Sequence, residues 1–316
     1  MTIGSHSQSF RMLVDAGSAD MWVPGDGCQG ENGGGCGPHP HLGPRSSSTF
    51  KDTRRAWYTS YGSGSASGTI VRDRVRFAGF SLEHTFGVAR NESRSFIEKD
   101  IPLDGVLGCA KSNISMQGVP TLVESLQSAG MIEKNIISYK ISRRSDGKND
   151  GEITLGGMDP TKYDPSTLVR LRNVNRLGFW AASLDALKIN GKHIKLGKEK
   201  ECILDTGSTL ISVPDEDAAI IHRSIPGSAF NSSLSSWTVP CRTKTIMTFY
   251  FGGRPFPVKP SDLAFLPVDN PKGACTSAIV GNGGGEGTWL LGDTVIKNIY
   301  LSTDQDRDEL AMARLT

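Results

Sequence analysis

Two short segments place an aspartate in closely matching surroundings. Residues 13–18 read Leu-Val-Asp-Ala-Gly-Ser, and residues 203–208 read Ile-Leu-Asp-Thr-Gly-Ser. In each segment the apolar pair predicts a strand in the core, and the glycine allows a tight turn whose backbone amides approach the carboxylate. The serine hydroxyl can hydrogen-bond that carboxylate and fix its plane. The two segments therefore predict two buried and oriented carboxyl groups, those of Asp15 and Asp205.

Two such carboxyl groups, held face to face, can activate a water molecule. Carboxyls about 3 Å apart cannot both ionise, so they share one proton over a wide range of pH. The ionised acid can take a proton from a water held between them, while the neutral acid hydrogen-bonds a peptide carbonyl. This chemistry hydrolyses an amide bond with no metal and no covalent intermediate. It predicts a peptidase with an acidic pH optimum.

The two aspartate segments belong to a longer internal repeat. Val23-Pro24 and Val213-Pro214 follow the two aspartates at the same distance. Later in each half comes an apolar element that ends in glycine, at residues 105–108 and 289–292. Because the matching motifs occur in the same order and at similar spacing in the two halves, they predict a duplicated domain. We expect a first lobe over residues 1–172 and a second lobe over residues 173–316.

The chain between these motifs favours strands over helices. It contains 37 glycines among 316 residues, and most apolar runs are short and bounded by Gly, Pro, Asn or Ser. The best strand candidates are residues 10–14, 69–77, 152–155, 201–204 and 247–251. The best helix candidates are residues 121–128 and 218–224, the second preceded by acidic residues. These features predict a mostly β protein.

Taken in order, the motifs resemble those of the pepsin-like aspartic endopeptidases, and fungal members look most similar. The resemblance covers nearly the whole chain. Asp15 and Asp205 match the catalytic aspartates, Tyr61 begins a match to the flap hairpin at residues 61–65, and Trp22 matches the tryptophan that hydrogen-bonds the flap tyrosine. The resemblance implies a bilobal pepsin-like acid protease fold: two duplicated β-barrel-like lobes, a central cleft and a flap.

The resemblance also assigns roles to residues around the two aspartates. Those expected to support the active site are Gly17, Ser18, Trp22, Thr206, Gly207 and Ser208. Those expected to contact substrate are Tyr61, Gly62, Ser63, Ile97, Leu103, Phe179 and Thr209, with Gly207 and Ser208. The expected disulfides are Cys28–Cys36 and Cys241–Cys275. Large apolar side chains around the scissile bond are the expected preference, and pepstatin-type compounds the expected inhibitors.

The chain departs from the family pattern in two places. Ala16 stands where the family has threonine, so one of two hydroxyls that bond the opposite active-site loop is missing. The resemblance begins near residues 3–4, so we also expect the family's first strand to be absent, which would leave a sheet edge unpaired. These departures keep two alternatives open: a peptide-binding pseudoprotease that hydrolyses little, and a truncated product that folds poorly.

Composition and cysteine placement indicate which partners and which cellular location to expect. The net charge is +2 from 35 basic and 33 acidic residues, with no basic stripe for nucleic acid and no apolar run of membrane-spanning length. Paired cysteines and sequons at Asn91, Asn113 and Asn231 favour a secreted glycoprotein, or an acidic vacuole as second choice. We expect a monomer acting on proteins or peptides, with no cofactor.

Several cysteine and histidine residues invite a metal-site interpretation. Cys28, Cys36, His39 and His41 lie close in the sequence, but the spacing of the two cysteines is outside the usual zinc patterns. A disulfide is the favoured interpretation, and no metal is expected. The two remaining cysteines, at 109 and 202, are expected to be buried thiols outside any disulfide.

Overall fold

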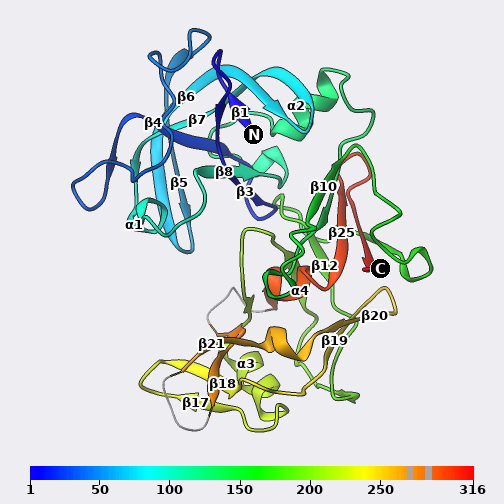
Figure 1. Cartoon of the computed structure of the whole chain (residues 1–316). Coiled ribbons are helices and arrows are strands. Elements are labelled where there is room, and N and C mark those ends of the chain that lie inside the picture. The colour runs from blue at the N-terminus through cyan, green and yellow to red at the C-terminus, as the bar shows by residue number, and fades with distance from the viewer. Residues whose placement is uncertain (269–272, 282–286) are drawn as a thin grey trace. The chain divides into compact units, whose positions relative to one another are not determined.

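The computed structural model describes residues 1–268, 273–281 and 287–316, which form two compact units, Met1–Glu133 and Lys134–Thr316. Strands dominate both units (Figure 1), which confirms the prediction of a mostly β protein with a pepsin-like fold. Residues 134–172 group with the second unit because their strands pair with the C-terminal strands. The lobes 1–172 and 173–316 therefore stay a proposal about the repeat, distinct from these compact units.

The first unit is organised by a single large sheet. Among the described residues it has eight strands, in the order β2-β1-β6-β7-β4-β8-β3, with β5 paired to β6. In Figure 1 the long strands β5, β6 and β7 lie side by side, as their antiparallel register requires. The strands are β1 (Thr2–Ile3), β2 (Gln8–Ser9), β3 (Met12–Asp15), β4 (Met21–Gly30), β5 (Lys51–Tyr61), β6 (Gly64–Phe77), β7 (Phe80–Glu92) and β8 (Gly105–Gly108).

The described part of the second unit contains four smaller sheets, each with its own strand order. One has the order β10-β9-β25-β26-β11 and another β12-β15-β24-β16-β23. The strands of the first are β9 (Ile136–Lys140), β10 (Glu152–Leu155), β11 (Val169–Arg172), β25 (Ile299–Asp304) and β26 (Glu309–Arg314). Those of the second are β12 (Ala181–Ser183), β15 (Glu201–Leu204), β16 (Ile211–Ser212), β23 (Ile279–Val280) and β24 (Thr288–Leu291).

The other two sheets of the second unit have four described strands each. Their orders are β14-β13-β19-β20 and β17-β18-β22-β21. The strands of the first are β13 (Ala186–Ile189), β14 (Lys192–His193), β19 (Met247–Phe251) and β20 (Arg254–Val258). Those of the second are β17 (Ala229–Asn231), β18 (Ser236–Pro240), β21 (Ala264–Pro267) and β22 (Ala274–Ser277). Three of the five strand predictions, at 152–155, 201–204 and 247–251, have the observed bounds.

The helices are short, and the two predicted at 121–128 and 218–224 correspond to α2 and α3. They are α1 (Arg94–Ile97), α2 (Leu122–Ser128), α3 (Asp215–Arg223) and α4 (Asp293–Ile296), with 3-10 turns at Ser112–Ile114, Arg144–Asp146, Pro165–Thr167 and Pro260–Leu263. Thr121 and Glu124 form a capping box at the start of α2, which explains the predicted helix there. In the part of the chain that the structure describes, no helix is long and apolar enough to cross a membrane.

Tryptophan side chains anchor the cores of both units. Trp22 in the first unit and Trp180 and Trp289 in the second are almost fully buried. Buried aromatic side chains supply the largest single contributions of apolar area to a core. Trp289 lies on β24, which pairs with β15, the strand that leads into Asp205. Trp22 lies on β4, which pairs with β8, the partner of the strand that carries Asp15.

Candidate active site

The first aspartate segment sits at the end of a parallel strand pair. Strand β3 runs parallel to β8 and places Asp15 opposite Gly108. The backbone amide of Cys109 donates a 2.7 Å hydrogen bond to the Asp15 carbonyl oxygen. A Cβ atom at Gly108 would lie 2.4 Å from the backbone of Ala19. The apolar element that ends in glycine therefore passes beneath the loop because it has no side chain at that point.

The second aspartate segment repeats this arrangement. Strand β15 runs parallel to β24, and the amide of Asp205 donates a 3.0 Å hydrogen bond to the carbonyl oxygen of Leu291. A Cβ atom at Gly292 would lie 2.4 Å from the carbonyl oxygen of Ser208. The internal repeat read from the sequence is thus a repeat of backbone structure.

The donors around each carboxylate are the same in the two loops. In the first, Gly17 N lies 2.8 Å from Asp15 Oδ1 and the Ser18 hydroxyl donates to Oδ2 at 2.5 Å. In the second, the amide of Gly207 donates to Asp205 Oδ1 at 2.8 Å and the hydroxyl of Ser208 to Oδ2 at 2.6 Å. Each carboxylate is therefore held by one amide and one hydroxyl, which fixes its plane.

Both carboxyl groups and the residues that follow them are buried. Asp15 is 5% exposed and Asp205 is 6% exposed. Ala16 is fully buried and Thr206 is 7% exposed. The position where this chain departs from the family pattern therefore lies inside the protein, where the missing hydroxyl changes internal contacts and not the solvated surface.

The predicted flap is an antiparallel hairpin that ends in a two-residue turn. Tyr61, the last residue of β5, pairs with Gly64, the first residue of β6, and the turn residues Gly62 and Ser63 are exposed. The indole Nε1 of Trp22 donates a 2.7 Å hydrogen bond to the Tyr61 hydroxyl oxygen. Burial is the main cause of the raised pKa of Tyr61, so this phenol stays neutral.

Ser93, the last residue of the sequon at Asn91, holds β6 beside the tip of this hairpin. The hydroxyl of Ser93 accepts from the amide of Ser65 at 2.9 Å, and the amide of Ser93 donates to the carbonyl oxygen of Ser65 at 2.9 Å. A Cβ atom at Gly64 would lie 2.2 Å from the Ser93 hydroxyl. The start of β6 is therefore fastened to the residue just before α1.

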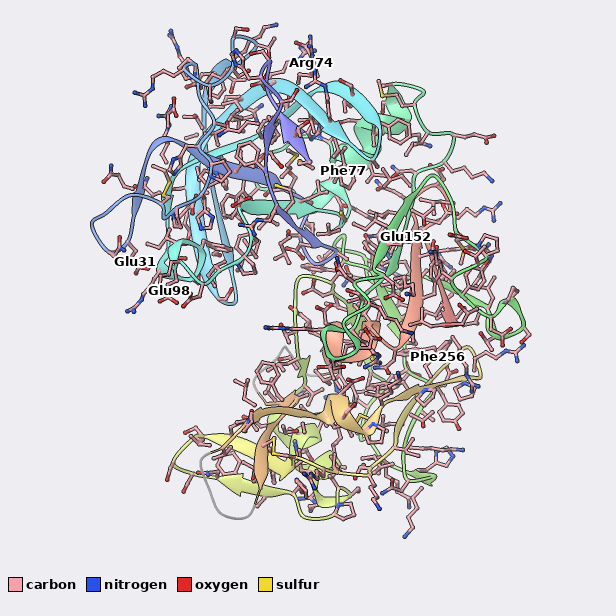
Figure 2. The ribbon with its side chains drawn as sticks, in the orientation of Figure 1. Glu31, Arg74, Phe77, Glu98, Glu152 and Phe256 are labelled. Atoms are coloured by element: carbon pink, nitrogen blue, oxygen red, sulfur yellow. A yellow bond between two sulfur atoms is a disulfide. The ribbon has the colours of Figure 1, made fainter. Side chains whose placement is uncertain are left out.

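The apolar residues assigned to substrate contact in the first unit gather around this hairpin. Tyr61 and Leu103 are partly buried and pack against a cluster that includes Trp22, Phe96 and Ile97. Glu31 and Glu98, labelled in Figure 2, line a cavity of about 570 Å³ that Ile97 also borders. A space therefore exists beside one of the residues expected to contact substrate.

The residues assigned to substrate contact in the second unit lie near the Asp205 loop and at the entry to β12. Phe179 is half-buried, and its amide donates a 3.0 Å hydrogen bond to Asn175 Oδ1. Thr209 is exposed, and its carbonyl oxygen accepts from the amide of Thr294 at 2.9 Å and from the Thr294 hydroxyl at 2.8 Å. Hydrogen bonds therefore hold the backbone at both positions.

Two further aspartates lie close to the segments of Asp15 and Asp205, and the sequence motifs did not indicate them. Asp20 accepts from the Ser115 hydroxyl at 2.5 Å and from the Met116 amide at 2.9 Å, which ties the first loop to the turn after β8. Burial raises the pKa of Asp293 to about 7, and the charge of Asp205 adds to the shift. The signal for Asp293 was its place directly after Gly292.

Both predicted disulfides are present. Because Cys28 and Cys36 are bonded to each other, they are not thiolate ligands for a metal ion. Cys28 and Cys36 are bonded with their Cα atoms 5.5 Å apart, and Cys241 and Cys275 with theirs 4.9 Å apart. Cys202 is a buried thiol as predicted, and burial raises its pKa. The buried carboxyl of Glu92 lies beside the first disulfide, with Oε1 3.6 Å from Cys28 Sγ.

Comparison with known proteins places the chain in a family. A family model described as eukaryotic aspartyl protease matches residues 1–315. The chain therefore belongs to the eukaryotic aspartyl proteases, and the resemblance drawn from its motifs is confirmed.

Curated relatives agree with this assignment over almost all of the chain. A probable aspartic-type endopeptidase CTSD of Arthroderma otae is 35% identical, covering 95% of this chain and 77% of that protein. A protein of the same name from Trichophyton verrucosum is 34% identical, over 98% of this chain and 59% of its own length. Pepsin A of Sus scrofa is 30% identical, over 98% of this chain and 79% of that protein. The chain thus spans about three-fifths of the Trichophyton relative.

Proposed function

We propose that the chain is an aspartic endopeptidase that hydrolyses peptide bonds of proteins, with Asp15 and Asp205 as its catalytic acids. The main support is that a glycine amide and a serine hydroxyl at matching positions orient each of the two buried carboxyl groups. A turn aspartate with a purely structural role would not need the same arrangement twice on two parallel strand pairs.

In this mechanism the two acids act on one water molecule. The pair carries a single proton, so one carboxylate accepts a proton from the water while the other acid hydrogen-bonds the carbonyl oxygen of the scissile peptide. Water oxygen attacks the carbonyl carbon, and the leaving amine takes the proton as the C–N bond breaks. Ser18 and Ser208 keep the acids oriented, and a shared proton requires mildly acidic conditions.

We assign substrate contact to the hairpin and to the second loop. Tyr61 would close over the peptide, and the apolar neighbours Ile97 and Leu103 favour large apolar side chains at the scissile bond. On the other side of the scissile bond, the substrate would contact Phe179 and Thr209, together with Gly207 and Ser208. The proposal includes inhibition by pepstatin-type compounds and a monomeric state. It also includes secretion, with an acidic vacuole as the second choice.

Ala16 favours one alternative function, a pseudoprotease that binds peptides and hydrolyses little. Its side chain is fully buried and has no hydroxyl, so the first loop lacks the contact that a threonine would offer. A lost buried hydrogen bond costs roughly 1–3 kcal/mol when its partner stays unsatisfied. That cost would loosen the geometry of the acids without removing either carboxyl group.

Hydrolysis of a quenched peptide with two apolar residues at its centre separates the two functions. We would measure product release from about pH 3 to pH 7, the range over which such a pair gains and loses its shared proton, with and without pepstatin. Pepstatin-sensitive release supports the endopeptidase. Pepstatin binding without product release, in a sample that unfolds cooperatively, supports the pseudoprotease, and a gain of turnover in Ala16→Thr would identify the cause.

A further inference from the structure

One face of the sheet β14-β13-β19-β20 carries a distinctive set of side chains. Lys188 of β13 lies opposite His193 of β14 and Thr248 of β19. Tyr250 of β19 lies opposite Pro255 of β20. We call this the basic face. Its members are Lys188, His193, Lys195, Thr248, Tyr250, Pro255 and Pro257.

The other face of the same sheet is buried, so the basic face must point toward the surface. Leu187, Ile189, Phe249 and Phe256 alternate with the members of the basic face and are at most 2% exposed. Figure 2 labels Phe256, the β20 residue between the two prolines. Because a one-residue slip would exchange the two faces, burial of these apolar side chains keeps the lysines exposed or half-buried.

Lys195 continues the basic face beyond the last residue of β14. The amide of Ile194 donates a 2.9 Å hydrogen bond to the carbonyl oxygen of Leu187, so the ladder between the two strands extends past His193. Residues two apart on a strand share a face, which places Lys195 beside His193. Three basic side chains therefore lie on neighbouring positions of two paired strands.

These lysines are not neutralised by neighbouring acids. Over residues 1–268, 273–281 and 287–316, Lys188, Lys192 and Lys195 take part in no ion pair. The outward positions of β13, β14, β19 and β20 that the register pairs here hold no acid. Asp185, just before β13, accepts a 2.6 Å hydrogen bond from the amide of Gly253 instead. The ammonium groups of these lysines are therefore available to bind an anionic partner.

A second basic segment lies against the turn of this hairpin. The amide of Asn190 donates to the carbonyl oxygen of Ile246, and the amide of Ile246 donates to Asn190 Oδ1, both at 2.9 Å. These two bonds hold the loop that carries exposed Arg242 and Lys244 beside Gly191 and exposed Lys192. The positive surface thus extends from the sheet onto its turn.

The aromatic ring of Tyr250 lies among these basic side chains. The Nζ atom of Lys188 lies 4.7 Å from the centre of the Tyr250 ring, which orders the ammonium group over the ring. Pro255 and Pro257 on the edge strand lack amide hydrogens, so this edge is a poor hydrogen-bond donor to another strand. Half-buried Tyr250 and the two prolines form a flat apolar strip beside the lysines.

We propose that the basic face binds an anionic polysaccharide. Sulfate, phosphate or carboxylate groups of the polysaccharide would pair with Lys188 and Lys195 on the basic face and with Lys192 at its turn. A sugar ring would lie on the strip formed by Tyr250, Pro255 and Pro257. Single-stranded nucleic acid fits less well because successive bases need a series of aromatic rings, and the basic face has one. The site is independent of the proposed peptidase activity and would hold the protein on a charged polymer.

Binding of the whole chain to heparin, a sulfated polysaccharide, tests the proposal against dextran as a neutral polymer. We expect heparin binding that weakens steeply with salt, and none to dextran. Lys188→Glu with Lys195→Glu should lower the affinity by about tenfold or more. Lys99→Glu with Lys148→Glu makes the same change in net charge at exposed positions elsewhere and should lower it by less than about threefold. Equal losses in the two pairs, or no binding by the unaltered chain, would overturn the proposal.

Tyr250→Ala tests the class of ligand. We expect it to weaken binding of heparin severalfold and to leave binding of inorganic polyphosphate, which has no sugar ring, within about twofold. Equal weakening of both probes would overturn the polysaccharide and leave a site for any polyanion. Lys188→Ala with Lys195→Ala, a milder change, guards against misfolding of the charge-reversed variant and should give a smaller loss in the same direction.

Discussion

Trp22 Nε1 lies 2.7 Å from the hydroxyl oxygen of Tyr61, and the two rings meet edge-on against the same phenylalanine. The ring centre of Phe96 is 5.1 Å from that of Trp22 and 5.7 Å from that of Tyr61. Trp22 is only 1% exposed, so its position is set by the core of the first unit. The residue at the tip of the hairpin is therefore positioned by a buried side chain of another strand.

We predict that Trp22→Phe and Tyr61→Phe each lower kcat/KM for peptide hydrolysis and that their effects are not additive. Each variant removes the same hydrogen bond, which contributes about 0.5–1.5 kcal/mol. A double-mutant cycle on kcat/KM should therefore give a coupling energy of that size. Effects that simply add would show that the bond has no role in positioning the hairpin.

Glu92 should make the folded chain less stable as the pH rises. Burial raises the pKa of its carboxyl from 4.5 to about 8, so the folded state holds this proton more tightly than the unfolded state. The resulting stability is complete below about pH 4.5 and is lost as the pH rises through 8. The loss is on the order of 1.4 kcal/mol for each pH unit between these values.

Thermal unfolding at about pH 5, 7 and 9 measures this effect, with Glu92→Gln as the matched variant. Glutamine keeps the shape and cannot ionise, so its free energy of unfolding should fall less over this range than that of the unaltered chain. Were both proteins to lose the same stability between pH 5 and pH 9, a different group would be responsible.

Asp293 should extend activity toward the neutral end of the pH range. Burial raises the pKa of its carboxyl to about 7, so the group is neutral in acid and gains a charge near Asp205 as the pH passes 7. That charge disfavours ionisation of the catalytic acid. The charged Asp293 therefore helps the pair keep its shared proton. We expect the profile of kcat/KM against pH to fall off at lower pH in Asp293→Asn than in the unaltered chain, and to be unchanged below about pH 5. An identical profile in the two proteins would contradict this.

The second unit should depend strongly on one buried ion pair. Lys200 Nζ lies 2.8 Å from Asp217 Oδ2, which also accepts a 2.8 Å hydrogen bond from Trp289 Nε1. Lys200→Met leaves the carboxylate buried without its cation, and removal of one partner of such a pair typically costs about 3–5 kcal/mol. Urea unfolding curves of the variant and the unaltered chain measure the difference.

The matched control for this variant is Lys51→Met, which breaks an exposed pair with Glu83. The two side chains of that pair are 67% and 44% exposed, and exposed pairs contribute less than about 1 kcal/mol. A loss of stability in Lys200→Met no larger than that in Lys51→Met would show that the buried pair is dispensable.

Much of the candidate site could be predicted because its signals are local. The turn glycine and serine after each aspartate stand two and three residues away, and their hydrogen bonds form within one loop. The helix α2 was predicted for the same reason, since Thr121 and Glu124 cap it locally. The sequence placed the start of the second helix too late, because Asp215 and its acidic neighbours form the first turn of α3 itself.

The parts that were missed depend on contacts between distant segments. Asp20 owes its place to the turn at Ser115, and Ser93 owes its place to Ser65 across the hairpin. Glu92 ends a strand, and it is buried where its carboxyl lies beside the Cys28–Cys36 disulfide, far away in the sequence. Likewise, no local signal shows that β9 and β11 pair with strands near the C-terminus.

The measurement we would make first compares the peptide hydrolysis of Asp15→Asn and Asp205→Asn with that of the unaltered chain at its best pH. If both acids act on one water, each variant should lose at least about a thousandfold in kcat/KM. Each should also keep a cooperative thermal unfolding transition. Substantial hydrolysis by either variant would mean that the reaction needs only one of these acids, and the paired mechanism would be wrong.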